Sequence, residues 1–76
     1  MNMSIRYCLS WNYLPRAASL AEKLEEKFGG KVAVLEGAKG EFSVWLGETL
    51  VAGKSDGMFP QPQEVLERMG LALEQN

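Results

Sequence analysis

The first third of the chain changes from a strand pattern to a helix pattern. Residues 3–7 alternate apolar and polar, which predicts a first strand with Met3, Ile5 and Tyr7 on one face. After a short loop, apolar residues recur every three or four positions up to Phe28, with Glu and Lys at most other positions. This spacing predicts an amphipathic helix whose apolar stripe consists of Leu14, Ala17, Ala21, Leu24 and Phe28.

Start and stop signals lie at both ends of this predicted helix. Asn12 is expected to be the N-cap, because its side chain can accept a hydrogen bond from the first turn. Pro15 then falls in that turn, where its missing N–H does no harm. Gly29 and Gly30 provide a left-handed stop directly after Phe28.

Three further strands are predicted after the helix. Residues 31–36 form a nearly continuous apolar run, which suits a central strand buried on both faces of a sheet. Residues 41–46 and 49–53 predict two antiparallel strands. Between them, Gly47-Glu48 is expected to form a two-residue turn with glycine first, as type II′ geometry requires.

A second helix is predicted near the end of the chain. Asp56-Gly57 marks a tight turn in the loop that precedes it, and prolines delay a helix until about Pro62. Residues 63–74 follow, with an apolar stripe of Val65, Leu66, Met69, Ala72 and Leu73.

The order β-α-β-β-β-α predicts an α/β (α+β) fold in a single domain over residues 1–76. The first strand, helix and second strand form a βαβ unit, whose strands should be parallel. The hairpin adds two antiparallel strands, so we expect a four-stranded mixed sheet with both helices on one face. This is the thioredoxin-like pattern without its middle helix.

The composition excludes several classes of function. The net charge of −2, with basic residues scattered along the chain, argues against a nucleic-acid partner. The absence of histidine and the single cysteine exclude Ser-His and Cys-His pairs, a multi-thiolate zinc site and an intramolecular disulfide. No apolar run approaches the about 18 residues of a membrane span, and no signal-peptide core is present. We therefore expect no membrane partner and a reducing, cytoplasmic location.

The one thiol lies where the first strand passes into the first helix. A helix N-terminus next to Cys8 would favour the thiolate, because unpaired amides and the helix dipole stabilise negative charge. Arg16 would add positive charge if its side chain turned back toward this loop. Cys8 is thus a candidate redox thiol that exchanges with glutathione or a protein partner. The alternative is that Cys8 is a small apolar residue under the loop and inert.

Several segments between Ser4 and Leu73 resemble one known family in their order and spacing. They are Ile5-Arg6-Tyr7-Cys8, Tyr13-Leu14-Pro15-Arg16-Ala17, Gly40-Glu41-Phe42-Ser43-Val44, Gly47-Glu48-Thr49-Leu50-Val51 and Gly57-Met58-Phe59-Pro60. Together they resemble the selenoprotein W-like (Rdx-type) proteins. The resemblance implies a thioredoxin-like fold and a cytoplasmic thiol or selenol redox role, without an organic cofactor and with glutathione as a candidate co-substrate.

The chain departs from that family at the second redox position. Family members carry Cys-x-x-Cys or Cys-x-x-selenocysteine after the first strand. Cys8 matches the first position, whereas Trp11 stands at the second. A dithiol–disulfide cycle needs two sulfurs within bonding reach, so one chain cannot complete it. The remaining candidate chemistry is single-thiol exchange through Cys8.

The side chains around Cys8 also suggest a non-enzymatic interaction module. Its candidate interaction rim consists of Leu9, Ser10, Trp11, Met58 and Phe59, because the family fold would bring the two loops together. Alternatively, Trp11 fills the position of the missing redox residue and the Phe59 loop tucks onto the sheet. The expected partner is a protein or glutathione, and the chain is expected to be a monomer or a weak homodimer. Trp45 lies either under the helices or on the open sheet face, where it would support a dimer contact.

Overall fold

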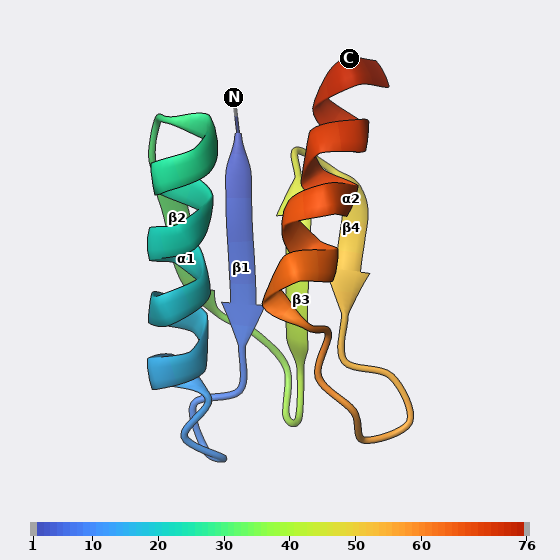
Figure 1. The fold of residues 1–76 in the computed structure, drawn as a ribbon. Helices are drawn as coiled ribbons and strands as arrows, with labels where there is room; N and C mark the ends of the chain where they lie inside the picture. The colour runs from blue at the N-terminus through green and yellow to red at the C-terminus, as the bar shows by residue number, and fades with distance from the viewer. Residues whose placement is uncertain (1, 76) are drawn as a thin grey trace.

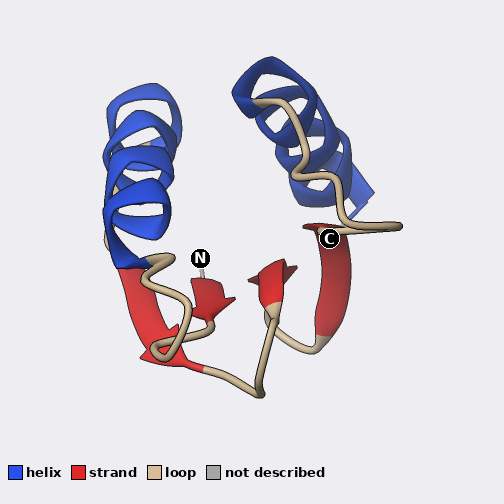
Figure 2. Ribbon diagram, turned by 90° about the horizontal axis from the view of Figure 1, so that it is seen from below, coloured by secondary structure: helices blue, strands red, loops and turns tan. Residues whose placement is uncertain are grey.

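In the computed structural model, which describes residues 2–75, helices and strands follow one another in the predicted order. The strands are β1 (Met3–Tyr7), β2 (Val32–Glu36), β3 (Phe42–Leu46) and β4 (Thr49–Gly53). The helices are α1 (Leu14–Phe28) and α2 (Pro62–Gln75). Both helices cover the same face of the sheet (Figure 1, Figure 2), which confirms the predicted two-layer arrangement.

The four strands form one mixed sheet in the order β2-β1-β3-β4. β1 pairs in parallel with β2 and antiparallel with β3, so that Ile5 lies beside Val34 on one side and Val44 on the other. β3 pairs antiparallel with β4, with a register shift between Val44 and Trp45. The predicted hairpin turn is present, and Gly47 has the positive φ of 61° that its first position requires.

The prediction that residues 31–36 form a central strand is wrong. β2 is an edge strand, and the two central strands are β1 and β3. Within β2 only Val32 is fully buried, and Leu35 is 47% exposed on the face away from the helices. The apolar run reflects the high β propensity of these side chains. It does not show with which strands the segment pairs, and so cannot distinguish a central strand from an edge strand.

The prediction that Asn12 is the N-cap of α1 is also wrong. Asn12 has a φ of 59°, and Tyr13 occupies the N-cap position without a side-chain cap hydrogen bond. The left-handed conformation, which asparagine tolerates, completes a tight turn in which the Asn12 N–H donates to the Leu9 carbonyl at 3.1 Å. Pro15 lies in the first turn of the helix as predicted.

The hydrophobic core lies between the helices and the two central strands. Fully buried side chains come from β1 and β3 and from both helices: Met3, Ile5, Val44, Leu24, Val65 and Met69. Leu14 is exposed at the start of α1, so the buried stripe of that helix begins at Ala17. α2 packs beside α1 through Gly70, where an added Cβ would lie 3.8 Å from the Phe28 ring.

Trp45 lies on the open face of the sheet. Its neighbours Val44 and Leu46 are buried in the core, and its indole N–H donates to the Ser43 hydroxyl at 2.8 Å. The Arg6 guanidinium carbon lies 4.5 Å from the centroid of the indole ring. The alternative that placed Trp45 under the helices is therefore excluded.

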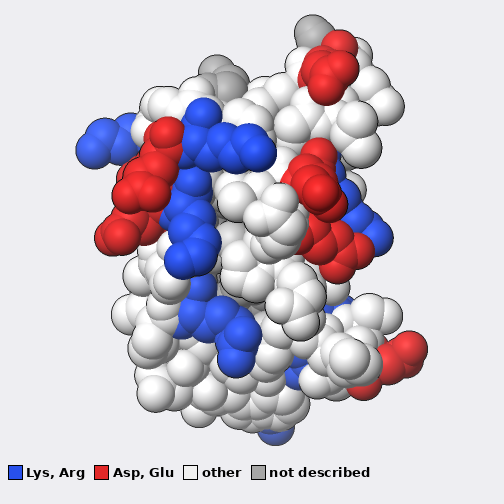
Figure 3. Space-filling view, in the orientation of Figure 1, with Lys and Arg blue, Asp and Glu red and all other residues white. Residues whose placement is uncertain are grey.

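The helix-bearing face has an uneven distribution of charge. Figure 3 shows a column of Lys and Arg side chains along α1, between one group of acidic side chains at its outer edge and another over α2. A net charge of −2 therefore coexists with a locally basic strip beside the space between the helices.

Candidate functional site

The sheet register brings the end of β1, the start of β3 and the end of β4 to the same end of the sheet. Tyr7, at the end of β1, pairs with Phe42 at the start of β3, and Ser43 pairs with Gly53 at the end of β4. The residues that follow β1 and β4, Cys8 and Lys54, therefore emerge at the same edge. The Lys54 N–H holds the end of β4 against the start of β3 by donating to the Phe42 carbonyl at 2.8 Å.

Cys8 lies at the junction between β1 and the loop that leads into α1. It is a free cysteine with only 1% of its surface exposed. The Tyr13 N–H donates to the Cys8 carbonyl at 3.3 Å, which folds the loop back over the strand end. The surface at this junction is therefore formed by the loop residues Leu9 to Asn12 and not by the thiol.

Four aromatic rings form a cluster next to this loop. Tyr13 is its centre, with ring centroids 5.9 Å from Trp11, 6.4 Å from Phe42 and 4.8 Å from Phe59. Phe42 and Phe59 contact each other at 5.3 Å. All four pairs have edge-to-face geometry, which is favourable for aromatic quadrupoles. The cluster fixes the relative positions of side chains from the Cys8 loop, β3 and the Phe59 loop.

Two cations hold this aromatic cluster in place. The Lys54 ammonium donates to the Tyr13 hydroxyl at 2.9 Å and lies 4.8 Å from the centroid of the Trp11 ring. The Arg16 guanidinium carbon lies 3.9 Å from the centroid of the Phe59 ring. Cation–π contacts of this kind contribute about 0.5–1 kcal/mol each at exposed sites.

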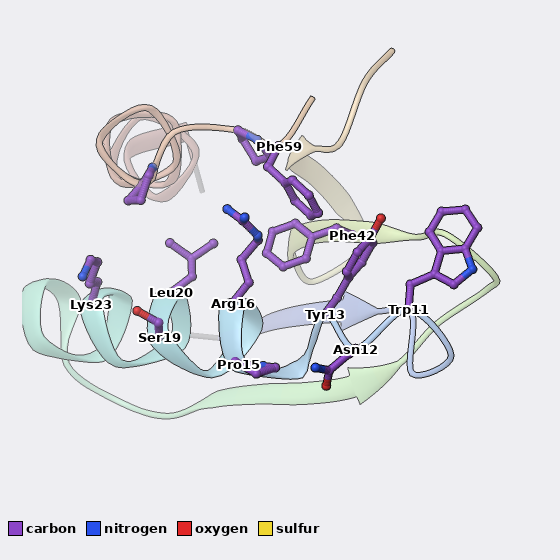
Figure 4. Close-up of a pocket in the computed structure, with 12 residues that line it drawn as sticks. Trp11, Asn12, Tyr13, Pro15, Arg16, Ser19, Leu20, Lys23, Phe42 and Phe59 are labelled. Atoms are coloured by element: carbon purple, nitrogen blue, oxygen red, sulfur yellow. The ribbon is translucent and has the colours of Figure 1, made fainter. Parts of the chain in front are cut away.

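A groove of about 610 Å³ runs between α1 and the Phe59 loop. Its α1 wall carries side chains three and four positions apart, and its floor and far wall carry aromatic rings and prolines (Figure 4). It is lined by Trp11, Asn12, Tyr13, Pro15, Arg16, Ser19, Leu20, Lys23, Phe42, Phe59, Pro60 and Pro62. This volume lies within the about 300–1,000 Å³ that binding pockets commonly have.

The residues of the predicted interaction rim are only partly brought together. Trp11, which is 49% exposed, and Phe59 both line the groove and meet through Tyr13. Met58 is 73% exposed and lines a second hollow of about 430 Å³, toward α2. Leu9 and Ser10 are exposed in the loop but do not line the groove.

Most side chains of the groove and its border were missing from the predicted site, and Tyr13, Phe42 and Lys54 are among them. Tyr13 and Phe42 appeared only within the segments that carry the family resemblance. The signal that connects them is the antiparallel register, since a residue directly after β4 must emerge beside the start of β3. A sequence pattern gives the strands but not this alignment.

The indole of Trp11 is positioned by the turn between β2 and β3. Gly40 has a φ of 76°, and a Cβ at this position would lie 3.0 Å from Trp11 Cζ3. Trp11 therefore packs on bare backbone on one side, contacts Tyr13 on another and still presents half of its surface to solvent.

Glu41 organises the opposite face of the sheet at this edge. Its carboxylate accepts hydrogen bonds from the Ser43 hydroxyl at 2.6 Å and the Ala38 N–H at 2.7 Å. These two bonds, the Ser43 bond first and then the Ala38 bond, hold the pKa of Glu41 below its ordinary value, and the charge of Arg6 acts in the same direction. This network supports the turn on which Trp11 rests.

Within residues 2–75, no group of three or more His, Cys, Asp or Glu side chains is placed to hold a metal ion. The helices in this part of the chain are too short or too polar to cross a membrane.

Comparisons with known proteins identify the family. The model of the Rdx family matches residues 2–70 of this chain. The chain belongs to the Rdx family. A search of the curated proteins found no significant match.

Solved structures share the fold of this chain. A crystal structure of a protein from Bordetella parapertussis is 29% identical, with a TM-score of 0.85 over 93% of this chain and 95% of that chain. A selenoprotein W-related protein from Vibrio cholerae is 24% identical, with a TM-score of 0.84 over 95% of each chain. The fold of this Rdx-family chain is therefore thioredoxin-like, as the sequence segments implied.

Proposed function

We propose that this Rdx-family chain is a non-enzymatic protein-interaction module whose binding surface is the groove between α1 and the Phe59 loop. The observation that carries the proposal is that Cys8 is buried while the groove beside it presents a preformed aromatic and basic surface. A lone thiol fits a reducing compartment, so we further propose that the module acts in the cytoplasm.

The groove favours binding because its aromatic side chains are already ordered. Trp11 contacts Tyr13 and Lys54, and Phe59 contacts Tyr13, Phe42 and Arg16. Ordering a free side chain on association costs roughly 0.5–1.5 kcal/mol, and much of that cost is avoided here. Trp and Tyr are also among the residue types that most often dominate binding energy at interfaces, and Trp11 and Tyr13 both line the groove.

The test compares the partner proteins that are recovered by two variants, each of which lacks one exposed apolar side chain. Trp11→Ala removes the anchor from the groove, and Leu35→Ala removes a side chain of similar exposure from β2, on the other face of the sheet. Affinity purification from the source cells, followed by quantitative mass spectrometry, compares the partners that each variant retains. We expect Trp11→Ala to lose specific partners and Leu35→Ala to keep them. Equal recovery by both variants contradicts the proposal.

A second candidate function is single-thiol exchange with glutathione. The position of Cys8 favours it, since the thiol lies one tight turn before the N-terminus of α1. In this step the Cys8 thiolate attacks one sulfur of glutathione disulfide. A bond from Cys8 Sγ to that sulfur forms as the original S–S bond breaks, and the other glutathione leaves as a thiolate that takes up a proton.

Mass spectrometry after incubation with glutathione disulfide tests this second candidate. A stoichiometric glutathione adduct on the folded chain would support exchange. An adduct that forms only on the chain unfolded in urea would exclude exchange under native conditions.

A further inference from the structure

The groove carries positive charge and no negative charge. Its lining contains Arg16 and Lys23 on the α1 wall and no Asp or Glu, although the chain as a whole has a net charge of −2. The acidic side chains of this face gather on either side of the basic column instead (Figure 3). Such a separation attracts an acidic ligand to the groove and repels it from the flanks.

Neither cation has a carboxylate partner among residues 2–75. Across residues 2–75, the one ion pair joins Arg68 to Glu64 on α2, outside this groove. Arg16 and Lys23 are both exposed on the groove wall and make no hydrogen bond to another side chain of the described residues. Their donors are therefore available to a bound molecule.

Arg16 is held in position without being neutralised. Its guanidinium carbon lies 3.9 Å from the centroid of the Phe59 ring, and Figure 4 shows its side chain reaching across from α1 toward that ring. A stacked guanidinium keeps its planar set of N–H donors, which matches the two oxygens of a carboxylate. The stack thus orders Arg16 before any ligand arrives.

The spacing of the cations indicates the size of the ligand. Arg16 and Lys23 are seven residues apart on one helix, which separates their backbone positions by roughly 10 Å at a rise of 1.5 Å per residue. The Ser19 hydroxyl lies on the same wall between them. Acidic side chains three residues apart in a polyproline II segment point to the same side and are separated by a similar length of about 9 Å.

We propose that the occupant of the groove is an acidic peptide segment of a partner protein, with two carboxylate side chains that pair with Arg16 and Lys23. An apolar side chain of the same segment would contact the rings of Phe59 and Tyr13. This inference rests on the proposed function and specifies the chemistry of the partner.

The experiment selects ligands from a displayed library of random dodecapeptides on the immobilised chain. Enriched peptides are synthesised with their Glu and Asp residues, and again with Gln and Asn in place of these. Calorimetry then measures the affinity of each pair for the wild type, for Arg16→Gln, for Lys23→Gln and for the control Lys31→Gln. The control removes the same charge from an exposed residue outside the groove.

The inference predicts that enriched peptides are acidic and that the amide versions bind about tenfold more weakly or worse, as expected for loss of a charge-assisted hydrogen bond. Arg16→Gln and Lys23→Gln should each weaken binding by a similar factor, and Lys31→Gln should change it less than twofold. Lys23 is exposed and makes no ring contact, so its variant tests the charge even if Arg16→Gln loosens the Phe59 loop.

Three outcomes would overturn the inference. Neutral or basic peptides that lose affinity in Trp11→Ala but not in Lys23→Gln would refute the acidic partner and leave the interaction module standing. A chain that dimerises in sedimentation and becomes monomeric in Lys23→Gln would identify a second copy as the occupant. No enrichment of any peptide above an empty support would contradict both the inference and the proposed function.

Discussion

At the scale of single residues, Trp11 is the side chain that links the Cys8 loop to the groove. Its indole packs against Gly40 on one side and Tyr13 on another. Its other surface stays open to solvent at the end of the groove. Sequence reasoning placed Trp11 in this loop correctly but did not foresee Gly40 as its support, because the contact joins residues distant in the chain.

Gly40→Ala tests this support. Gly40 and Gly57 have nearly equal positive φ values, 76° and 77°, but only a Cβ at Gly40 would meet Trp11, at 3.0 Å. Both alanine variants should lose about 1 kcal/mol of stability from backbone strain, and Gly40→Ala should lose more because the indole must move. Urea unfolding measures the free energies, and tryptophan fluorescence should shift in Gly40→Ala alone. Equal losses without that shift would mean that Gly40 does not support Trp11.

Glu41 gives the stability of this edge a dependence on pH. Its pKa is lowered in the folded chain by the Ser43 and Ala38 hydrogen bonds, so its contribution is complete above the ordinary carboxyl pKa of about 4.3 and is lost as pH falls through the lowered value. Glu41→Gln should therefore destabilise the chain at pH 7 and differ less from the wild type at strongly acid pH.

Urea unfolding of the wild type and Glu41→Gln across that pH range provides the measurement. Glu48→Gln, in the exposed turn between β3 and β4, is the matched control. A stability difference for Glu41→Gln that is the same at every pH would show that the Glu41 hydrogen bonds do not favour its charged form.

At the scale of elements, periodicity predicted the helices and strands but not the order of the strands in the sheet. The spacing of Ala17, Ala21 and Leu24 predicted the buried face of α1, and these residues are buried. The apolar run of β2 was assigned to the centre of the sheet, whereas β2 is at the edge. Strand propensity is a property of the segment, but position in a sheet depends on which strands pair, and that depends on the whole fold.

Gly70→Ala tests the packing between the two helices. Gly70 lies inside α2, and an added Cβ would make an ordinary contact of 3.8 Å with Phe28 of α1. The variant should raise the free energy of unfolding by about 1 kcal/mol, because alanine favours the helix over glycine and its methyl group contacts Phe28 without a clash. Thermal and urea unfolding would both detect the gain. A loss of stability would show that the helices pack more closely at this point than the structure has them.

At the scale of the whole molecule, the sheet register explains both what the sequence predicted of the candidate site and what it missed. The junction at Cys8 could be located from local patterns, because strand, loop and helix follow one another there. Lys54, Phe42 and Tyr13 come together only through the pairing of β1, β3 and β4. Cys8 is therefore buried, and the groove beside it presents aromatic and basic side chains to solvent.

The rate of Cys8 modification tests this account most directly. A disulfide reagent such as dithiobis-nitrobenzoate is added to the folded chain and to the chain unfolded in urea, and thiol release is followed by absorbance. The account predicts that the folded chain reacts at least about 100-fold more slowly, since a local opening of about 3 kcal/mol must precede attack. If the folded chain reacted as fast as the unfolded one, the thiol would be accessible. That result would contradict the proposal that the groove binds a partner without participation of Cys8.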